Sequence, residues 1–420
     1  MHERKYYLIQ DGGKVDPAIK KLFSKGLEAR DIKVNRKGEF FNFVGFLLSD
    51  ENILISFPKN TFTTSYLKQL ANNKNKLSRY ISILFNCIKR TANNKDSKYM
   101  GIRYEMDSNY PFLDFLEVYN YYKRYGLFTN EKEVKKFGYG GRISWKDTIN
   151  KSPKLIYNNN LLFLPLVIKK NMQQYVFVSK CMAYVINSTL DKFSLFIDGE
   201  RVSLDTGSVD FSNKYLVISQ LKEVKRTVFK DIHQRLLNSL ISFFVREKTK
   251  GGDYQLKIYS FNLIWENMVK EYLRTKFLGI ENLKIKWSDK VQNNLFVKKT
   301  FYPDIRGEDG YAIEPDYYLV SDNIRYIFDA KYYMNVKELD YKQISYYFLL
   351  KHIDSKRDNE GKILSVLKTY NALILPSPKN EYSEIHFQLN SDYNMDEEDF
   401  IIISYYLNTV NVMENYTMLN

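Results

Sequence analysis

Short apolar runs separated by turn residues occupy the first 60 positions of the chain. The runs are Tyr6 to Ile9, Phe40 to Leu48 and Ile53 to Phe57, and Pro58 ends the last of them. Each run has the length of a strand, so the pattern predicts a small β-rich unit at the N-terminus.

After this β-rich unit, apolar residues recur at helical spacing. One helical pattern runs from about Ser65 to Ala92 and a second from Phe112 to Tyr125. Over residues 222–248 a continuous apolar stripe, three and four residues apart, predicts one long helix.

Two glycines, Gly251 and Gly252, then interrupt the chain, and we expect a domain boundary there. The predicted organisation begins with a β-rich and then helical region, residues 1–250. A second domain, residues 251–420, follows.

A tight β-hairpin is predicted at the centre of the second domain. Tyr317 to Val320 and Ile324 to Phe328 are apolar runs, and Ser321, Asp322 and Asn323 are turn residues between them. Because side chains alternate along a strand, the two residues Asp329 and Lys331 should project together while Phe328 and Ala330 point into the core.

This hairpin should bring two carboxylates together, since Asp316 opens the first strand and Asp329 follows the second. Adjacent carboxylates are costly unless a cation lies between them, and their oxygens suit Mg²⁺ or Mn²⁺. Lys331 could polarise a water molecule or stabilise a pentavalent phosphate. The alternative is that all three are ordinary strand-end residues; the combination of Pro-Asp, hairpin and Asp-x-Lys favours the functional interpretation.

Two predicted helices flank the hairpin. Upstream, the apolar spacing predicts a helix over 259–277, and Glu266 lies at the margin of its apolar stripe. Glu266 is either a third acidic ligand or a solvated residue at that boundary. Downstream, Gln343 and Tyr347 lie one turn apart on the next helix. They bind a phosphate or a metal-bound water, or are simply an amide and a phenol at a helix boundary.

Further strands are expected at Ala372 to Leu375 and Ile385 to Leu389, with a helix from about Phe400. A second Pro-Asp pair, Pro303-Asp304, lies in a segment with the pattern of a loop. Asp304 is therefore a minor alternative to Asp316.

Composition points to nucleic acid. The formal net charge is +14, with 35 tyrosines and 28 phenylalanines. Cations neutralise phosphate and aromatic rings stack on bases, so a nucleic acid is the expected partner. The charge is spread along the chain, however, and an AT-rich genome would also encode many lysines and tyrosines.

Other classes of protein are disfavoured. The two cysteines, Cys87 and Cys181, are far apart, and the four histidines form no metal-binding pattern, which argues against a disulfide scaffold or a zinc hydrolase. The sequence shows no signal peptide, no apolar run long enough to span a membrane and no phosphate-binding loop. A cytoplasmic protein is expected.

Residues 259–350 resemble the PD-(D/E)xK nuclease superfamily, in the version that has Gln-x-x-x-Tyr on the following helix. The segments Phe43 to Leu48 and Ile53 to Lys59 resemble the opening of McrC-like restriction subunits. Gly138 to Ile149 resembles a signature of the LlaJI family of restriction endonucleases.

The resemblance implies an α/β (α+β) fold with a nuclease core, a mixed sheet flanked by helices. Carried over by motif, the catalytic residues are Glu266, Asp316, Asp329 and Lys331, with Gln343 and Tyr347 in support. The resemblance also implies double-stranded DNA as the substrate and an AAA+ GTPase or ATPase partner of the McrB type, with residues 1–250 as the part that docks the partner or reads DNA. A companion DNA methyltransferase is implied if the system is methylation-based. A non-catalytic DNA-binding scaffold and a repair or recombination nuclease are the alternative functions.

Overall fold

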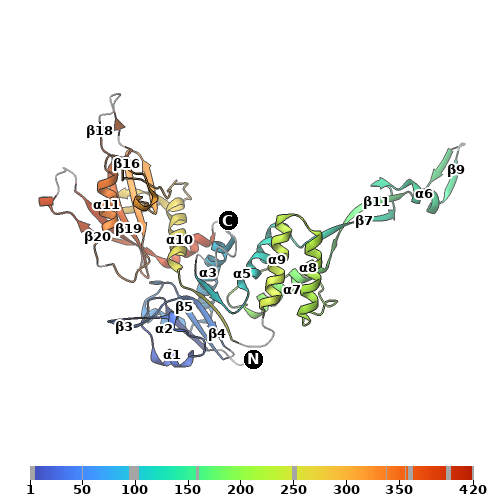
Figure 1. Ribbon diagram of the computed structural model, residues 1–420, viewed down its shortest axis with the longest axis horizontal. Coiled ribbons are helices and arrows are strands. Elements are labelled where there is room, and N and C mark those ends of the chain that lie inside the picture. Colours follow the sequence, from blue (N-terminus) through green and yellow to red (C-terminus); the bar gives the residue numbers. More distant parts are fainter. Residues whose placement is uncertain are drawn as a thin grey trace. The chain divides into compact units, whose positions relative to one another are not determined.

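The structure is a computed structural model that describes residues 5–49, 51–93, 104–157, 160–247, 253–336, 338–354, 356–357, 363–393 and 399–418. It is a mixed α/β protein, as predicted, and Figure 1 follows the chain between its termini. The chain forms two compact units. Unit 1 consists of Met1–Tyr110, Leu195–Ile197 and Lys250–Asn420, and unit 2 of Pro111–Ser194 and Asp198–Thr249.

The boundary expected near residue 250 lies close to a point where the chain passes from unit 2 back to unit 1. Gly251 and Gly252, which suggested it, are outside the described residues. The compact units nevertheless differ from a division into 1–250 and 251–420, because the first 110 residues belong with the C-terminal part.

The first sheet of unit 1 explains this difference. Its strands have the order β1-β5-β4-β12-β6. They are β1 (Lys5–Gln10), β4 (Val44–Leu48), β5 (Asn52–Phe57), β6 (Met106–Ser108) and β12 (Tyr254–Ile258). β1 runs parallel to β5, whereas β12 pairs antiparallel with both β4 and β6. An internal strand of the N-terminal sheet therefore comes from far along the chain.

The predicted strand from Phe40 to Leu48 is in fact two strands. β3 (Gly38–Phe41) pairs with β2 (Ile32–Asn35) in a separate two-stranded sheet, and β4 begins at Val44. The backbone of Asn42 bonds Asp31 instead of a strand partner, which separates the two. Since residues on both sides of Asn42 are apolar and buried, the hydrophobic pattern did not reveal the break.

Helices α1 (Pro17–Leu22), α2 (Thr64–Leu70) and α3 (Lys74–Asn93) complete the first part of unit 1. The helical pattern predicted from Ser65 to Ala92 is thus divided into α2 and α3. Thr63 caps α2, because its hydroxyl accepts a hydrogen bond from the backbone of Tyr66.

The second sheet of unit 1 has the order β15-β16-β19-β21-β20. Its strands are β15 (Tyr317–Ser321), β16 (Ile324–Ala330), β19 (Lys368–Ser377), β20 (Tyr382–Gln388) and β21 (Ile401–Asn408). The three central strands β16, β19 and β21 run parallel, and both edge strands run antiparallel to their neighbours. The carboxyl ends of the three parallel strands therefore share one edge of the sheet.

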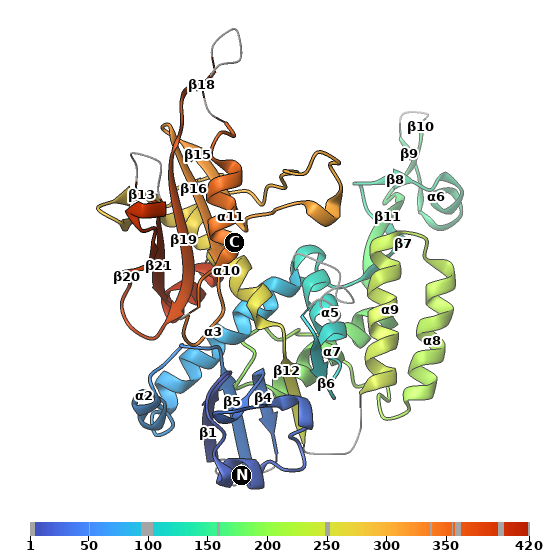
Figure 2. The ribbon, with the colours of Figure 1, turned by 60° about the vertical axis from the view of Figure 1, so that its left-hand side comes forward.

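Three helices accompany this sheet: α10 (Phe261–Lys276), α11 (Tyr341–Leu350) and α12 (Thr409–Met418). Figure 2 shows α11 against β16 and β19, and its Tyr346 and Leu350 pack on Ile327 of β16. Short strands add to the periphery: β13 (Phe277–Glu281), β14 (Lys284–Trp287), β17 (Lys356–Arg357) and β18 (Ile363–Ser365).

The strands predicted at Ala372 to Leu375 and Ile385 to Leu389 are confirmed as parts of β19 and β20. The helix predicted from about Phe400 is wrong, because residues 401–408 form β21 and the helix begins only at Thr409. β21 lies between two other strands and is mostly buried. A continuously apolar strand of this kind has no alternation to distinguish it from a buried helix.

Unit 2 combines a helical bundle with a long β-arm. Its helices α5 (Phe112–Tyr125), α7 (Phe177–Lys192), α8 (Lys214–Thr227) and α9 (Asp231–Arg246) pack on one another. From them extends an antiparallel pair, β7 (Thr129–Phe137) and β11 (Val167–Tyr175) (Figure 1). The arm carries β8 (Arg142–Ile143), α6 (Trp145–Lys151), β9 (Lys154–Tyr157) and β10 (Asn160–Phe163).

Helix α5 has the predicted bounds, but the long helix predicted over 222–248 is wrong. The chain leaves helical geometry at Val228, whose backbone is extended, and α9 starts at Asp231. The side-chain amide of Gln234 bonds the carbonyl of Lys225, 2.9 Å away, and so ties the two helices together at the break. The apolar stripe continues across the break in phase, so spacing alone predicted one helix.

Candidate active site

The predicted hairpin is confirmed. β15 and β16 pair antiparallel from Tyr317 opposite Phe328 to Ser321 opposite Ile324. Asp322 and Asn323 alone form the turn, with φ of +52° and +62°. Positive φ at both central residues is the geometry of a type I′ turn, which matches the twist of the flanking strands and suits Asp and Asn. The register places Asp316, just before β15, beside the end of β16.

Asp316 and Asp329 form a buried acid pair. The Asp316 Oδ2 atom accepts a hydrogen bond from the backbone of Ala330 at 3.0 Å, and Asp329 is only 5% exposed. Burial, and then the negative charge of Asp329, raise the pKa of Asp316 to about 7, and Glu266 adds to the effect. Two carboxylates that repel each other in this way attract a cation.

Lys331 projects to the same side as Asp329, as predicted, while Phe328 is fully buried on the other side. The Lys331 Nζ atom lies 2.5 Å from Asp329 Oδ2 and 3.0 Å from Asp340 Oδ2. Burial acts to lower the pKa of Lys331, but the charges and hydrogen bonds of these two acids outweigh it, so that its pKa is raised. The lysine is therefore a fixed cation at the edge of the acid pair.

Glu266 approaches this pair from helix α10. The hydroxyl of Tyr317 donates to the backbone carbonyl of Glu266 at 2.7 Å, which fixes the helix against the start of β15. The half-exposed Lys298 bonds Glu314 at 2.6 Å, and its pKa is raised by that bond, with smaller contributions from Asp316 and Glu266. The three predicted acids thus lie within electrostatic range of one another.

Helix α11 begins beside the acid pair. Asp340 caps it, accepting a bond from the backbone of Gln343 at 3.1 Å. Gln343 is fully buried, and within the described part of the chain neither atom of its side-chain amide has a partner. Buried side-chain amides without a hydrogen-bond partner are rare in proteins. Where one occurs, the site often binds a water molecule or a ligand.

The adjacent tyrosines Tyr346 and Tyr347 of α11 have different surroundings. The Tyr347 ring stacks on Phe400 at 4.1 Å and packs in an apolar cluster. The Tyr346 hydroxyl donates to the carbonyl of Glu314 at 3.1 Å. Burial raises the pKa of Tyr346, and the charges of Asp329 and Asp316 raise it further, so this ring is near the acid pair.

Asp304, the minor candidate, lies apart in an exposed loop. Its carboxylate bonds the guanidinium of Arg306 at 2.7 Å, and this bond lowers the pKa of Asp304. The pair satisfies both charges locally, as expected of a loop residue.

The donor set suits a divalent cation only in part. Among the described residues no three acidic, histidine or cysteine side chains are arranged to hold a metal by themselves. Mg²⁺, however, commonly takes one or two carboxylates and completes its shell with water and substrate phosphate. The pair Asp316 and Asp329 fits that kind of site, and the unsatisfied amide of Gln343 offers a further polar group.

Sequence reasoning missed two residues of this site, Asp340 and Tyr346. Asp340 immediately precedes α11, so it lies at the same end of the helix as Gln343. Tyr346 follows Gln343 by three positions, so these two residues share a face of α11. An acid at the helix start and a tyrosine at the i+3 position were the signals available.

Fold and site together define a mixed α/β protein that presents an acid pair and a lysine where its parallel strands end. The chain belongs to the LlaJI restriction endonuclease family, whose model matches residues 43–403. It is therefore a member of a family of restriction nucleases. The predicted resemblance to that family, which rested on Gly138 to Ile149, is confirmed.

Solved structures give a weaker similarity, and no curated protein matches. Four chains of known structure match, one of them in a refined half-complex of the tetradecameric assembly of Thermococcus gammatolerans McrB AAA+ hexamers with bound McrC. That chain is 11% identical with a TM-score of 0.38, and 99% of each chain is covered. This similarity does not establish a shared function. In the described ranges no helix has the length and hydrophobicity needed to cross a membrane.

Proposed function

We propose that this chain is the cutting subunit of a restriction system and hydrolyses phosphodiester bonds of double-stranded DNA in a metal-dependent reaction. The observation that carries the proposal is the buried pair Asp316 and Asp329 with Lys331 2.5 Å from Asp329. The pair lies at the edge where the parallel strands end, a common location for ligand sites in open α/β sheets.

Each residue has a specific role in this proposal. Asp316 and Asp329 hold Mg²⁺ or Mn²⁺, with Glu266 as the third acid at the edge of the site. A cation bound there supplies an activated water and neutralises charge on the phosphate. Lys331 binds a non-bridging oxygen of that phosphate and stabilises the charge that develops on it. Gln343 orients the attacking water or the phosphate through its free amide.

Asp340 and the α11 tyrosines support this arrangement. Asp340 holds the Lys331 ammonium together with Asp329. Tyr346 fixes the backbone at Glu314, two residues before Asp316. Tyr347, the motif tyrosine, keeps the helix on the sheet through its stack on Phe400.

The proposal includes a partner. Resemblance to McrC-like subunits supports an AAA+ GTPase or ATPase that licenses cleavage, and a companion DNA methyltransferase would protect host DNA. Unit 2 is our candidate for docking or DNA reading. Its arm carries the residues that resemble the family signature and exposes large apolar side chains there, Trp145 at 57% and Ile156 at 81%.

Plasmid cleavage tests the assignment. The purified chain, alone and with the product of a neighbouring gene, is incubated with supercoiled plasmid and Mg²⁺ or Mn²⁺. Asp329→Ala and Lys331→Ala should each abolish cleavage by the active complex, whereas Asp304→Ala, which removes an acid from an exposed loop, should not. Unchanged cleavage by either site variant would exclude this catalytic centre, and loss in all three would point to a general defect.

A further inference from the structure

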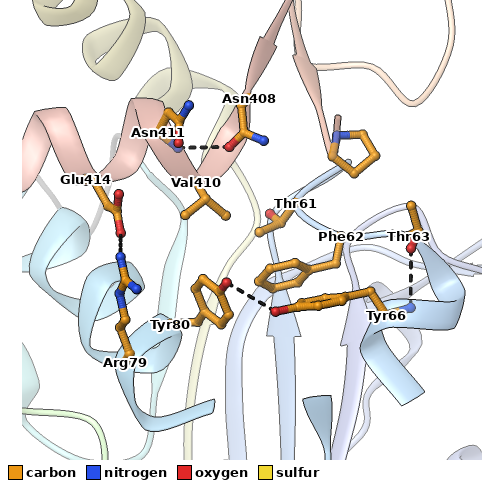
Figure 3. A pocket seen from close by; sticks show the side chains of 11 residues that line it. Thr61, Phe62, Thr63, Tyr66, Arg79, Tyr80, Asn408, Val410, Asn411 and Glu414 are labelled. Atoms are coloured by element: carbon orange, nitrogen blue, oxygen red, sulfur yellow. Dashed lines mark hydrogen bonds and ion pairs between the residues drawn. The ribbon is translucent and has the colours of Figure 1, made fainter. Parts of the chain in front are cut away.

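A second cavity of unit 1, separate from the acid pair, has a volume of about 370 Å³ (Figure 3). Its wall comes from the loop after β5, from α2 and α3, and from the start of α12. The lining residues used below are Phe62, Tyr66, Arg79, Tyr80, Asn411 and Glu414. None of them belongs to the proposed cutting centre.

Three aromatic rings form one side of this cavity. Phe62 is buried, and its ring lies 5.4 Å from that of Tyr66 and 4.8 Å from that of Tyr80. The hydroxyls of Tyr66 and Tyr80 bond each other at 3.3 Å, which fixes both rings (Figure 3). Both tyrosines are only half-buried, so part of each ring remains open to a ligand.

The opposite side is polar but carries no net charge. Arg79 and Glu414 lie 2.6 Å apart and neutralise each other. The lining therefore offers no net charge to a ligand, and a neutral polar group fits it.

One hydrogen-bonding group is free. The backbone of Asn411 donates to Asn408, while in the described part of the chain its own exposed side-chain amide bonds nothing. An amide donates and accepts at once, which suits the edge of a flat heterocycle.

We infer that this cavity binds a nucleobase. Stacking on aromatic rings is available to every base because each has a flat π-face, and asparagine pairs with the adjacent donor and acceptor of a base edge. A purely apolar ligand would leave the asparagine and the ion pair unmatched. The cavity is also large enough for a base with its sugar. The base comes from a DNA strand or from a free nucleotide.

The loop that forms part of this cavity also contacts the segment beside the proposed cutting centre. The loop that supplies Phe62 continues back to Asn60, whose side-chain amide bonds the carbonyls of Tyr333 and Met334 at 3.3 and 3.1 Å. The backbone of Lys59 donates to the Tyr332 hydroxyl at 2.9 Å. These contacts hold the segment that directly follows Lys331.

Calorimetric titration of the full chain tests the inference. The probes are dAMP, dGMP, dCMP and TMP, with deoxyribose 5-phosphate as the control that lacks a base. At least one nucleotide should bind with a dissociation constant of about 1 mM or below, and the sugar phosphate should not. No nucleotide binding below about 10 mM, or equal binding of the sugar phosphate, would overturn the inference.

Variants locate the site. Tyr66→Ala should weaken binding by about tenfold or more, as expected for the loss of one base–aromatic stack, whereas Tyr66→Phe should retain it. Asn411→Ala changes only an exposed side chain and should also weaken binding. Tyr382→Ala, an exposed tyrosine on β20 outside the cavity, is the matched control. Binding unaffected by both Tyr66→Ala and Asn411→Ala would place the nucleotide elsewhere and refute the site.

A single-stranded 12-mer distinguishes the two sources of the base. If the base comes from DNA, the oligonucleotide binds more tightly than any mononucleotide and loses that advantage in Tyr66→Ala. If it comes from a free nucleotide, the mononucleotide binds at least as tightly. Because these readouts need no cleavage, their failure is independent of the fate of the catalytic assignment.

Discussion

The Asp340 carboxylate lies 3.0 Å from the Lys331 ammonium, across the connection from β16 to α11. Lys331 is thus held by two acids, one on its own strand and one at the start of the next helix. The same Asp340 caps α11. One side chain therefore positions both the proposed catalytic lysine and the helix that carries Gln343.

Replacing Asp340 should slow cleavage without unfolding the domain. Asn also caps helices well, so Asp340→Asn should keep the melting temperature while it removes the ion pair. We expect cleavage to fall by about 10- to 100-fold, the usual effect of losing an outer partner of a catalytic group. Initial rates of plasmid cleavage measure this, with the exposed Asp392→Asn as control. Full activity of Asp340→Asn would show that the contact does not position Lys331.

Stability of the metal-free protein should depend on Asp316. Its pKa is about 7 in the folded protein against an ordinary value of 3.8, so the folded state binds this proton more tightly. The resulting stabilisation is complete below about pH 4 and is lost as the pH rises through 7. In EDTA, the melting temperature of wild type should fall over this pH range. The melting temperature of Asp316→Asn should vary less with pH and should exceed that of wild type above pH 7.

A divalent cation should reverse this loss only in protein that retains Asp316. Above pH 7, Mg²⁺ or Mn²⁺ should raise the melting temperature of wild type, because a ligand that binds only the folded state stabilises it. Asp316→Asn should respond much less, and Asp304→Asn should behave as wild type. An equal response of wild type and Asp316→Asn would place the cation elsewhere.

The roles of Tyr346 and Tyr347 on α11 can be separated by removing one hydroxyl at a time. Tyr346→Phe loses the bond to the Glu314 carbonyl and should cost about 1 kcal/mol of stability and reduce cleavage. Tyr347→Phe keeps the stack of this ring on Phe400 and so should retain the contact that we propose holds α11 on the sheet. Chemical denaturation and plasmid cleavage check both. If Tyr347→Phe alone reduced cleavage, the hydroxyl of the motif tyrosine would be the functional one.

A buried ion pair should hold the first sheet together. Lys257 of β12 lies 2.7 Å from Asp31, and neither side chain is exposed. Lys257→Met would leave the Asp31 charge buried without a cationic partner, held by the Tyr259 hydroxyl and the Glu28 backbone N–H, at a cost of about 3–5 kcal/mol. Urea denaturation of unit 1 should show this loss, and the exposed Lys37→Met should not. A near-neutral Lys257→Met would mean that water or another group takes over the carboxylate.

The hairpin could be predicted because everything that specifies it is local. Alternation set the strands, Asp322 and Asn323 tolerate the positive φ of the turn, and register then placed Asp316 beside Asp329. The placement of Lys331 followed from the same alternation.

What could not be predicted depends on contacts distant in sequence, or on packing that periodicity does not record. Whether residues 401–408 form helix or strand is decided by their neighbours β19 and β20. The end of α8 at Val228 falls within an uninterrupted apolar stripe. The bond between Asp340 and Lys331 depends on the path of the chain from β16 to α11, which no pattern in that segment specified.

The position of β12 in the first sheet has a consequence for synthesis of the chain. On the ribosome, β4 emerges roughly 200 residues before the strand that pairs with it, a delay of about 10–40 s at typical translation rates. During this interval the β4 edge, formed by Val44–Leu48, is unpaired and apolar. A nascent chain of this protein therefore carries a transient aggregation-prone edge, and its yield in the cell should depend on chaperones that cover such edges.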